Sequence, residues 1–156
     1  MKIAVLSDTH GNKSMMSRAV EKIQHCDVVI HLGDNDRDVE YLRRYIELPF
    51  HVVRGNCDFG SKAPNELLQH VGGKKILMTH GHKYNVKYSL MRLIYRGEEA
   101  DADIILFGHT HAPMKEYNQN TLIMNPGSVG NPRMGPATIG LIEIKGEVIQ
   151  SSIVEI

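Results

Sequence analysis

Residues 3–10, IAVLSDTH, join a short apolar run to a turn whose polar side chains can bind a metal ion. Continuous apolar runs of this length, rich in Val, Ile and Leu, are typical of strands buried on both faces of a sheet. Four more runs lie at residues 28–30, 50–53, 76–78 and 104–107. The pattern therefore predicts five buried strands, each followed by a turn that carries polar side chains.

Between several of these runs, apolar residues recur at helical spacing. Three helical faces are predicted, formed by Met16, Ala19, Val20 and Ile23, by Val39, Leu42 and Ile46, and by Leu90, Leu93 and Ile94. The second is expected to end before Pro49, because the residue preceding a proline is disfavoured in a helix. Alternating strands and helices are the pattern of a parallel sheet with crossovers.

The last third of the chain shows a different pattern, with two predicted hairpins. Residues 114–117 and 121–124 flank Asn118-Gln119-Asn120, and residues 138–144 and 147–153 flank Lys145-Gly146. Turn residues between two strand-like runs are the usual signal of a hairpin. We expect a second, mostly antiparallel sheet packed on the first. Because no linker or repeat interrupts the pattern, residues 1–156 are predicted to form a single domain.

The composition excludes few partners but favours a cytoplasmic protein. Acidic and basic residues balance at 18 each, so no overall field indicates a nucleic acid or a membrane. Cys26 and Cys57 form no zinc or disulfide pattern, which fits a reducing compartment. No signal-peptide pattern or run of about 18 apolar residues is present. A cytoplasmic location is therefore predicted, and a homo-oligomer is left open.

Seven side chains with metal-binding oxygen or nitrogen atoms follow the five predicted strands: Asp8, His10, Asp34, Asn56, His80, His109 and His111. Two residues of an extended segment that are two apart point to the same side, so each D-x-H or H-x-H pair can face one point. The carboxyl ends of neighbouring parallel strands open onto a shared crevice. Oxygen and imidazole ligands favour a pair of hard or borderline divalent ions over a structural zinc site.

Each of these residues also has an ordinary structural interpretation. A lone Asp after a strand is usually a helix N-cap, and a lone His is usually a surface or hydrogen-bonded core residue. Such an interpretation is the more probable one for any single residue. It is improbable that it holds at all five strand ends at once. The histidines outside the pattern are predicted to be structural or surface residues: His25, His31, His51 and His70.

The order of these motifs resembles that of the calcineurin-like metallophosphoesterases, whose signature is D-x-H, G-D, G-N-H-D/E, a lone H and G-H-x-H. The matching segments are Asp8-Thr9-His10, Gly33-Asp34, Gly55-Asn56-Cys57-Asp58, His80 and Gly108-His109-Thr110-His111. Short length, GNCD and NPGSVGNPR are most similar to the small, cap-less YfcE-type phosphodiesterases. The resemblance implies a two-sheet α/β sandwich, with mixed parallel and antiparallel sheets flanked by helices.

The resemblance also implies two divalent metal ions that share Asp34 as a bridging ligand. One ion would be held by Asp8, His10, Asp34 and His111, and the other by Asp34, Asn56, His80 and His109. Mn²⁺ is the first expectation, with Ni²⁺, Zn²⁺ and Fe as alternatives. The implied reaction is hydrolysis of a phosphodiester by a dimetal-bridging hydroxide that attacks phosphorus in line, without a covalent enzyme intermediate.

Cys57 is where this chain departs from the wider signature, which has a histidine there. That histidine resembles a general acid or a group that stabilises the transition state, and a thiol with a reference pKa near 8.5 replaces it poorly. Slow turnover and a preference for activated esters are therefore expected. A covalent role for Cys57 is disfavoured because no basic partner can be assigned.

Three further residues are weaker candidates, and each has an ordinary alternative. Asp58 is predicted either to orient a metal-ligating His or the Asn56 amide, or to be a turn residue. His82 and Arg133 are substrate-binding candidates, with a solvated loop or surface role as the alternative. Asn125-Pro126-Gly127-Ser128 is expected to form a turn near the metal edge.

The leading functional hypothesis is a metal-dependent phosphodiesterase with Asp34, Asn56, Cys57 and Asp58 at its catalytic centre. The substrate class includes nucleotide-derived diesters, but nothing identifies the natural one. The alternative is a non-catalytic interaction scaffold, because a retromer subunit resembles the same fold. A scaffold need not keep its ligands, whereas all seven positions are filled here, which favours catalysis.

Overall fold

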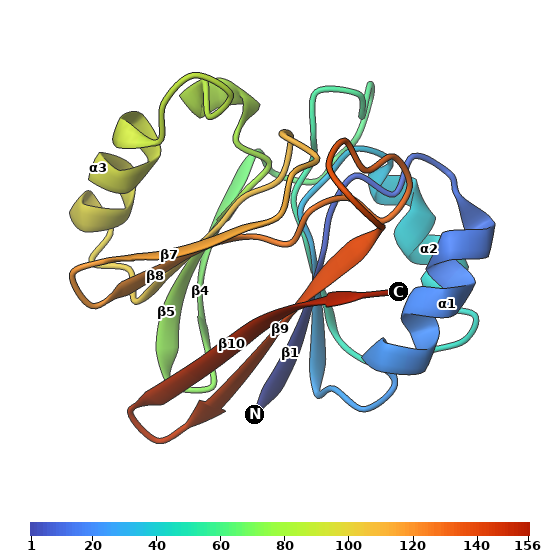
Figure 1. Cartoon of the computed structure of the whole chain (residues 1–156), viewed down its shortest axis with the longest axis horizontal. Coiled ribbons are helices and arrows are strands. Elements are labelled where there is room, and N and C mark those ends of the chain that lie inside the picture. Colours follow the sequence, from blue (N-terminus) through green and yellow to red (C-terminus); the bar gives the residue numbers. More distant parts are fainter.

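The computed structural model describes residues 1–156 as two five-stranded sheets packed face to face (Figure 1). In spatial order the first sheet contains β10 (Val148–Glu155), β9 (Thr138–Lys145), β1 (Lys2–Leu6), β2 (Val28–His31) and β3 (Phe50–Val52). The second contains β4 (Glu66–Val71), β5 (Lys74–Thr79), β6 (Ile104–Leu106), β8 (Thr121–Asn125) and β7 (Met114–Asn118). Each sheet has two parallel and two antiparallel strand pairings, so the predicted α/β sandwich is confirmed.

The prediction of a separate, mostly antiparallel second sheet was wrong. The parallel strands β5 and β6 lie in the second sheet, and the hairpin of β9 and β10 joins the first sheet by pairing with β1. Apolar periodicity shows that a segment is a strand but does not specify its neighbour. β4 was also missed, although Gly72-Gly73, both at positive φ, form a two-residue hairpin turn before β5.

The core follows from the alternation of side chains along each strand. In β1, Ile3 and Val5 face the second sheet, whereas Ala4 and Leu6 face the helices on the outer side. Burying one side chain of the size of Leu or Ile contributes about 1.5–3 kcal/mol, and the layer between the sheets contains 15 buried residues. Burial on both faces explains why these strands read as continuous apolar runs.

Helices cover both outer faces (Figure 1). On the first sheet lie α1 (Lys13–Ile23) and α2 (Val39–Leu42), and α3 (Met91–Glu99) lies on the second. The predicted faces are present, but α2 spans four residues and reaches Ile46 only through a turn. The longest of these helices has 11 residues, and none could cross a bilayer, which takes about 20.

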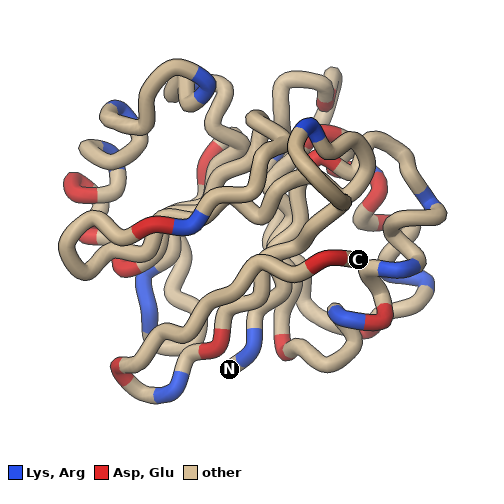
Figure 2. The backbone as a smooth tube through the Cα atoms, in the orientation of Figure 1, with Lys and Arg blue, Asp and Glu red and all other residues tan.

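The polar turns after β1, β2, β3, β5 and β6 gather at one edge of the sandwich. β1 starts at the N terminus in the lower part of Figure 1, so the turn that follows it lies at the opposite, upper end. Backbone hydrogen bonds join these turns within each sheet, from Asp8 N to Gly33 O in the first and from Gly108 N to His80 O in the second. Acidic and basic residues are otherwise interspersed along the chain (Figure 2).

Candidate metal centre

The turns that carry the predicted ligands share an unusual backbone conformation. Nine residues other than glycine have positive φ, and five of these are Asp8, His10, Asp34, His109 and His111. The left-handed region costs an ordinary side chain about 1 kcal/mol or more. The prediction that the D-x-H and H-x-H pairs are extended was therefore wrong. The left-handed turns bring these side chains together instead.

Two glycines allow the turns after β2 and β3 to touch. A Cβ atom at Gly33, whose φ is +94°, would lie 2.4 Å from the backbone nitrogen of Gly55. A Cβ atom at Gly55 would lie 2.1 Å from Oδ1 of Asp34. Only residues without a side chain fit at both positions, which places Asp34 and Asn56 on adjoining backbone segments.

Four predicted ligands form the first cluster at this edge. One ligand atom each from Asp8, His10, Asp34 and His111 lies within 4.8 Å of the others. Nε2 of His111 is 3.0 Å from Oδ1 of Asp8, and Nε2 of His10 is 3.9 Å from Oδ2 of Asp34. Both carboxylates and the His111 ring are buried, so their charge is poorly screened by water.

A second group meets the other oxygen of Asp34. Nε2 of His80 lies 3.5 Å from Oδ1 of Asp34 and 3.2 Å from Oδ1 of Asn56. The ring of His109 packs against that of His80, with 5.0 Å between centroids. The two oxygens of the Asp34 carboxylate thus face different clusters, which is the arrangement a bridging ligand needs.

The tautomers of two histidines show that these clusters fit a cation. Nδ1 of His80 lies 2.8 Å from the Leu32 carbonyl, and Nδ1 of His111 lies 2.6 Å from the Asn131 carbonyl. A carbonyl only accepts, so each Nδ1 carries a hydrogen and each Nε2 is the ring nitrogen left to face the site. Oδ1 of Asp8 is buried and has no hydrogen-bond partner. Acceptors facing one another in this way are stabilised by a divalent ion.

The pKa shifts of His109 and His111 are compatible with the same role. Burial, followed by the charges of His80 and Lys87, lowers the pKa of His109 to about 4, so its imidazole is neutral at pH 7. The carboxylate of Asp8 raises the pKa of His111, against a smaller opposing effect of burial. His111 and Asp8 therefore attract a proton to a position where a metal ion would satisfy both groups.

Asp58 has a different set of partners from the predicted one. Its carboxylate accepts four backbone N–H groups, those of Asp34, Asn35, Asp36 and Gly55, at 2.7–3.0 Å. Burial acts to raise the pKa of Asp58, but these four amides together lower it. Asp58 thus contacts neither a histidine nor the Asn56 amide and instead fixes the backbone that presents Asp34.

Cys57 lies at the edge of the second group. Its backbone N–H donates to Oδ1 of Asp34 at 2.9 Å, and its sulfur accepts a hydrogen bond from Nδ2 of Asn56 at 3.3 Å. Partial burial and the Asp34 carboxylate raise the pKa of Cys57 to about 11, although much of the residue is exposed. Its thiol is therefore protonated at neutral pH.

The two predicted substrate-binding residues lie on different flanks of the clusters. The ring of His82 is 5.4 Å from that of His80 and 6.1 Å from that of His109, measured between centroids. Arg133 is exposed, and its backbone N–H donates to the His111 carbonyl at 3.2 Å. His82 is thus the nearer of the two to the second group, and Arg133 adjoins the first.

Several positioning residues were missed or given no role by the sequence. Buried His31 lies 3.1 Å from Oγ1 of Thr9 and accepts the Gly33 N–H, so it links the turns after β1 and β2. Asn125 donates to the Gly108 carbonyl at 2.8 Å, and Ser128 donates to the Asp8 carbonyl at 2.8 Å. The NPGS turn therefore supports the ligand-bearing turns through its side chains. In the sequence, these residues were recognisable only as polar residues that adjoin apolar runs.

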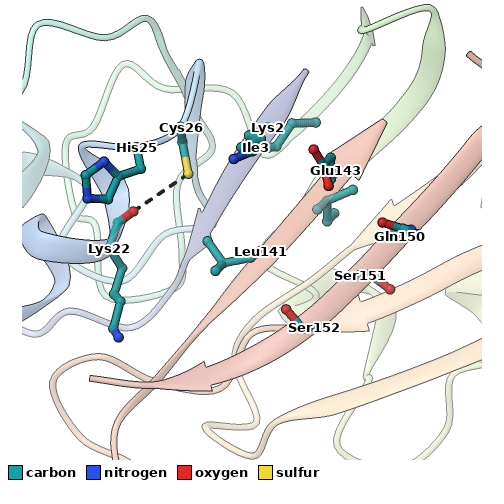
Figure 3. Close-up of a pocket in the computed structure, with 11 residues that line it drawn as sticks. Lys2, Ile3, Lys22, His25, Cys26, Leu141, Glu143, Gln150, Ser151 and Ser152 are labelled. Atoms are coloured by element: carbon teal, nitrogen blue, oxygen red, sulfur yellow. Dashed lines mark hydrogen bonds between the residues drawn. The ribbon is translucent and has the colours of Figure 1, made fainter. Parts of the chain in front are cut away.

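A larger cavity, of about 440 Å³, lies away from these clusters (Figure 3). It is formed where the end of α1, with Lys22 and His25, approaches the start of β1 and the strands β9 and β10. None of the predicted site residues lines it. This cavity is therefore not part of the candidate metal centre.

The protein is an α/β sandwich in which oxygen and imidazole side chains from the turns after five strands meet at one edge. The calcineurin-like phosphoesterase superfamily domain matches residues 1–147, and the chain belongs to that superfamily. The probable metallophosphoesterase YsnB of Bacillus subtilis is 38% identical over 135 residues, which cover 86% of this chain and 78% of YsnB. The phosphodiesterase YfcE of Escherichia coli K12 is 28% identical over 169 residues, covering 92% and 88%.

Solved structures show the same fold. A predicted phosphoesterase from Streptococcus pneumoniae TIGR4 superposes with a TM-score of 0.85 at 30% identity, covering 99% of this chain and 88% of the other. Vps29 of Entamoeba histolytica, in complex with Zn²⁺, superposes with a TM-score of 0.78 at 20% identity, covering 99% and 98%. The Vps29 likeness concerns the fold alone.

Proposed function

We propose that this protein is a two-metal phosphodiesterase and that residues 1–156 act as one domain. The observation that carries the proposal is the position of Asp34, whose Oδ2 faces His10 at 3.9 Å while Oδ1 faces His80 at 3.5 Å. Relatives named phosphodiesterase or metallophosphoesterase support the same chemistry. A cytoplasmic location stays a prediction.

In this proposal, each half of the site holds one divalent ion. Asp8, His10, Asp34 and His111 would hold the first, and Asp34, Asn56, His80 and His109 the second. The ions would supply a nucleophile at neutral pH and positive charge opposite the phosphoryl oxygens. Mixed oxygen and nitrogen ligation suits Mn²⁺, Ni²⁺, Zn²⁺ and Fe alike, and Mn²⁺ is our first choice among them.

The side chains of the site would position the metal ligands and would not themselves react with the substrate. Hydrogen bonds from Nδ1 to backbone carbonyls orient the rings of His80 and His111 and keep Nε2 free. Asp58 holds the Asp34 backbone through four amide hydrogen bonds. Cys57, with its raised pKa, is a poor proton donor to a leaving alcohol and a poor nucleophile. Esters with good leaving groups should therefore react best.

The test is hydrolysis of bis(p-nitrophenyl) phosphate by metal-stripped protein, before and after addition of Mn²⁺, Ni²⁺, Zn²⁺ or Fe²⁺. We expect a metal to restore activity and Asp34→Ala to lower kcat/KM by about 100-fold or more. His70→Ala is the matched control, since His70 is exposed on β4. If no metal restores hydrolysis although metal binds the folded protein, the interaction scaffold becomes the better hypothesis.

A further inference from the structure

A cavity of about 280 Å³ lies directly beside the proposed metal centre. Its wall includes the proposed ligand Asn56 and the neighbouring His82, together with Arg54, Phe59, Asn65 and Lys83. The volume is at the lower end of the range for ligand sites, about 300–1,000 Å³. The cavity is therefore suited to one group of a substrate whose reacting part lies elsewhere.

The two cations of this cavity have no acidic partner. Nε of Arg54 donates to Oδ1 of Asn65 at 3.1 Å, so a neutral amide orients the guanidinium without offsetting its charge. Neither Arg54 nor Lys83 forms an ion pair, whereas Arg96 and Lys74 pair with Glu66 and Glu147 elsewhere on the molecule. An oriented guanidinium with free N–H groups is a suitable partner for a phosphate.

Asp58 is the one acidic residue in the cavity wall, and its oxygens are already engaged. Each oxygen accepts two backbone N–H groups, from the turns after β2 and β3. Asp58 therefore forms no ion pair with Arg54, whose one side-chain acceptor is the neutral amide of Asn65. With two cations and one carboxylate, the wall carries a net positive charge next to the proposed ions.

Phe59 gives the same cavity an exposed aromatic surface. Its side chain is 85% exposed, the second largest exposure among the large apolar residues, although it belongs to the wall of a polar cavity. Stacking of a nucleobase on such a ring is worth about 1–3 kcal/mol per base. Nearby, Nδ1 of His82 is shielded from solvent and has no hydrogen-bond partner. The positive charge of the wall, the Phe59 ring and the free Nδ1 of His82 together suit a phosphorylated nucleotide.

We propose that this cavity binds a second phosphate group of a nucleotide phosphodiester whose scissile diester lies at the metal centre. Arg54 and Lys83 would contact the second phosphate, and the base would stack on Phe59. The inference rests on the proposed function, because it places the substrate next to the proposed ligand Asn56. It narrows the substrate class to nucleotides that carry an additional phosphate.

Equilibrium binding tests the cavity without any turnover. Calorimetry on the Mn²⁺-loaded protein would compare thymidine 3′,5′-bisphosphate with thymidine 5′-monophosphate, and we expect the bisphosphate to bind about tenfold more tightly. In the Arg54→Gln/Lys83→Gln double variant this preference should fall below about twofold. Lys83→Gln alone, at an exposed position, should reduce it by about threefold even if Arg54→Gln impairs folding.

The matched control is Lys22→Gln, which removes an exposed cation that lines the distant larger cavity and not this one. Lys22→Gln should keep the tenfold preference. Equal affinity for the two nucleotides in the wild type, an undiminished preference in the double variant, or no binding of either nucleotide would each overturn the inference.

Hydrolysis separates this inference from the proposed function. The substrates are thymidine 5′-(p-nitrophenyl) phosphate and its 3′-phosphorylated form, which release the same p-nitrophenolate. We expect the 3′-phosphate to raise kcat/KM about tenfold in the wild type and in Lys22→Gln, but not in the double variant. Equal hydrolysis of both esters would overturn the second-phosphate site and leave the phosphodiesterase intact. Hydrolysis of neither ester, with the binding preference retained, would overturn the phosphodiesterase.

Discussion

Oδ1 of Asp8 and Nε2 of His111 lie 3.0 Å apart in a buried position. Nδ1 of His111 donates to the Asn131 carbonyl, so Nε2 meets the carboxylate as a lone pair when the ring is neutral and as an N–H when the ring is protonated. The Asp8 carboxylate raises the pKa of His111 and so favours that proton. A divalent cation at this position would replace the proton and satisfy both groups.

The first prediction concerns Asp8→Asn. In the metal-free protein this variant should lose no more than ~1 kcal/mol of stability, because the asparagine Nδ2 can donate to Nε2 of a neutral His111 while its oxygen keeps the hydrogen bonds from Ser7 Oγ and His109 N. Mn²⁺ at about 100 times its Kd should raise the free energy of unfolding of the wild type by ~2.7 kcal/mol. In Asp8→Asn the gain should fall below ~0.5 kcal/mol.

Urea unfolding with and without Mn²⁺ measures both quantities. An equal metal-induced gain in the wild type and in Asp8→Asn would show that Asp8 is not a ligand.

The second prediction concerns the carboxylate of Asp58, which accepts four backbone N–H groups. Asp58→Asn replaces one oxygen by an N–H donor that faces other donors, and we expect a loss of ~2–4 kcal/mol in the free energy of unfolding. Because these amides position Asp34, metal affinity should fall by about 10–100-fold.

Asp101→Asn is the matched control for Asp58. Asp101 also has positive φ, but its side chain is 99% exposed and reaches Lys75 only at 3.8 Å. Its substitution should change stability by less than ~0.5 kcal/mol and leave metal affinity unaltered. Comparable losses in the two variants would mean that the four amide hydrogen bonds carry no special weight.

The third prediction concerns the reactivity of Cys57. Partial burial and the negative charge of Asp34 disfavour the thiolate and raise the pKa of Cys57 to about 11. In metal-free Cys26→Ser protein, iodoacetamide should therefore react slowly at pH 7, and the rate should rise about tenfold per pH unit up to pH 10. A rate that levels off near pH 8.5, as for an ordinary thiol, would contradict the raised pKa.

The fourth prediction concerns the pH dependence of stability. Burial lowers the pKa of His31 below its ordinary value of 6.5. Protonation would in addition place a second ring N–H against the Gly33 amide, which donates to Nδ1. The unfolded chain then binds more protons, so His31 contributes stability above about pH 6.5 that is lost as the pH falls below it. Metal-free wild type should therefore lose stability between pH 6.5 and 5.

The variant His31→Gln should show a shallower loss over this pH range, because its side chain does not titrate. Urea unfolding at several pH values measures the slope. His25→Gln, at an exposed position outside the site, should retain the wild-type slope. If His31→Gln and the wild type have the same slope, His31 is not the residue that titrates.

Local sequence was sufficient to predict where the strands lie and which side chains follow them. The runs at 3–6, 28–30, 50–53, 76–78 and 104–107 are confirmed as β1, β2, β3, β5 and β6. The superfamily and the two-sheet sandwich are confirmed as well. The assignment of individual residues to the metal ions stays a prediction.

Contacts between distant segments decided what could not be predicted. The hairpin of β9 and β10 pairs with β1, and β5 leaves the first sheet for the second, because pairing depends on partners that periodicity does not identify. The hydrogen-bond partners of Asp58 were likewise not predicted, since its four amide donors come from the turns after both β2 and β3. Nothing near Asp58 in the chain specifies that the β2 turn lies within reach.

By itself the sequence determined which side chains are candidate metal ligands, because residue type and the position after a buried strand are local properties. Only the tertiary structure decided how these side chains face one another. Left-handed turns orient Asp8 and His111, and a carbonyl from a distant loop selects the tautomer of His111. The carboxylate of Asp34 divides between two groups because two sheets meet at one edge, which no single segment encodes.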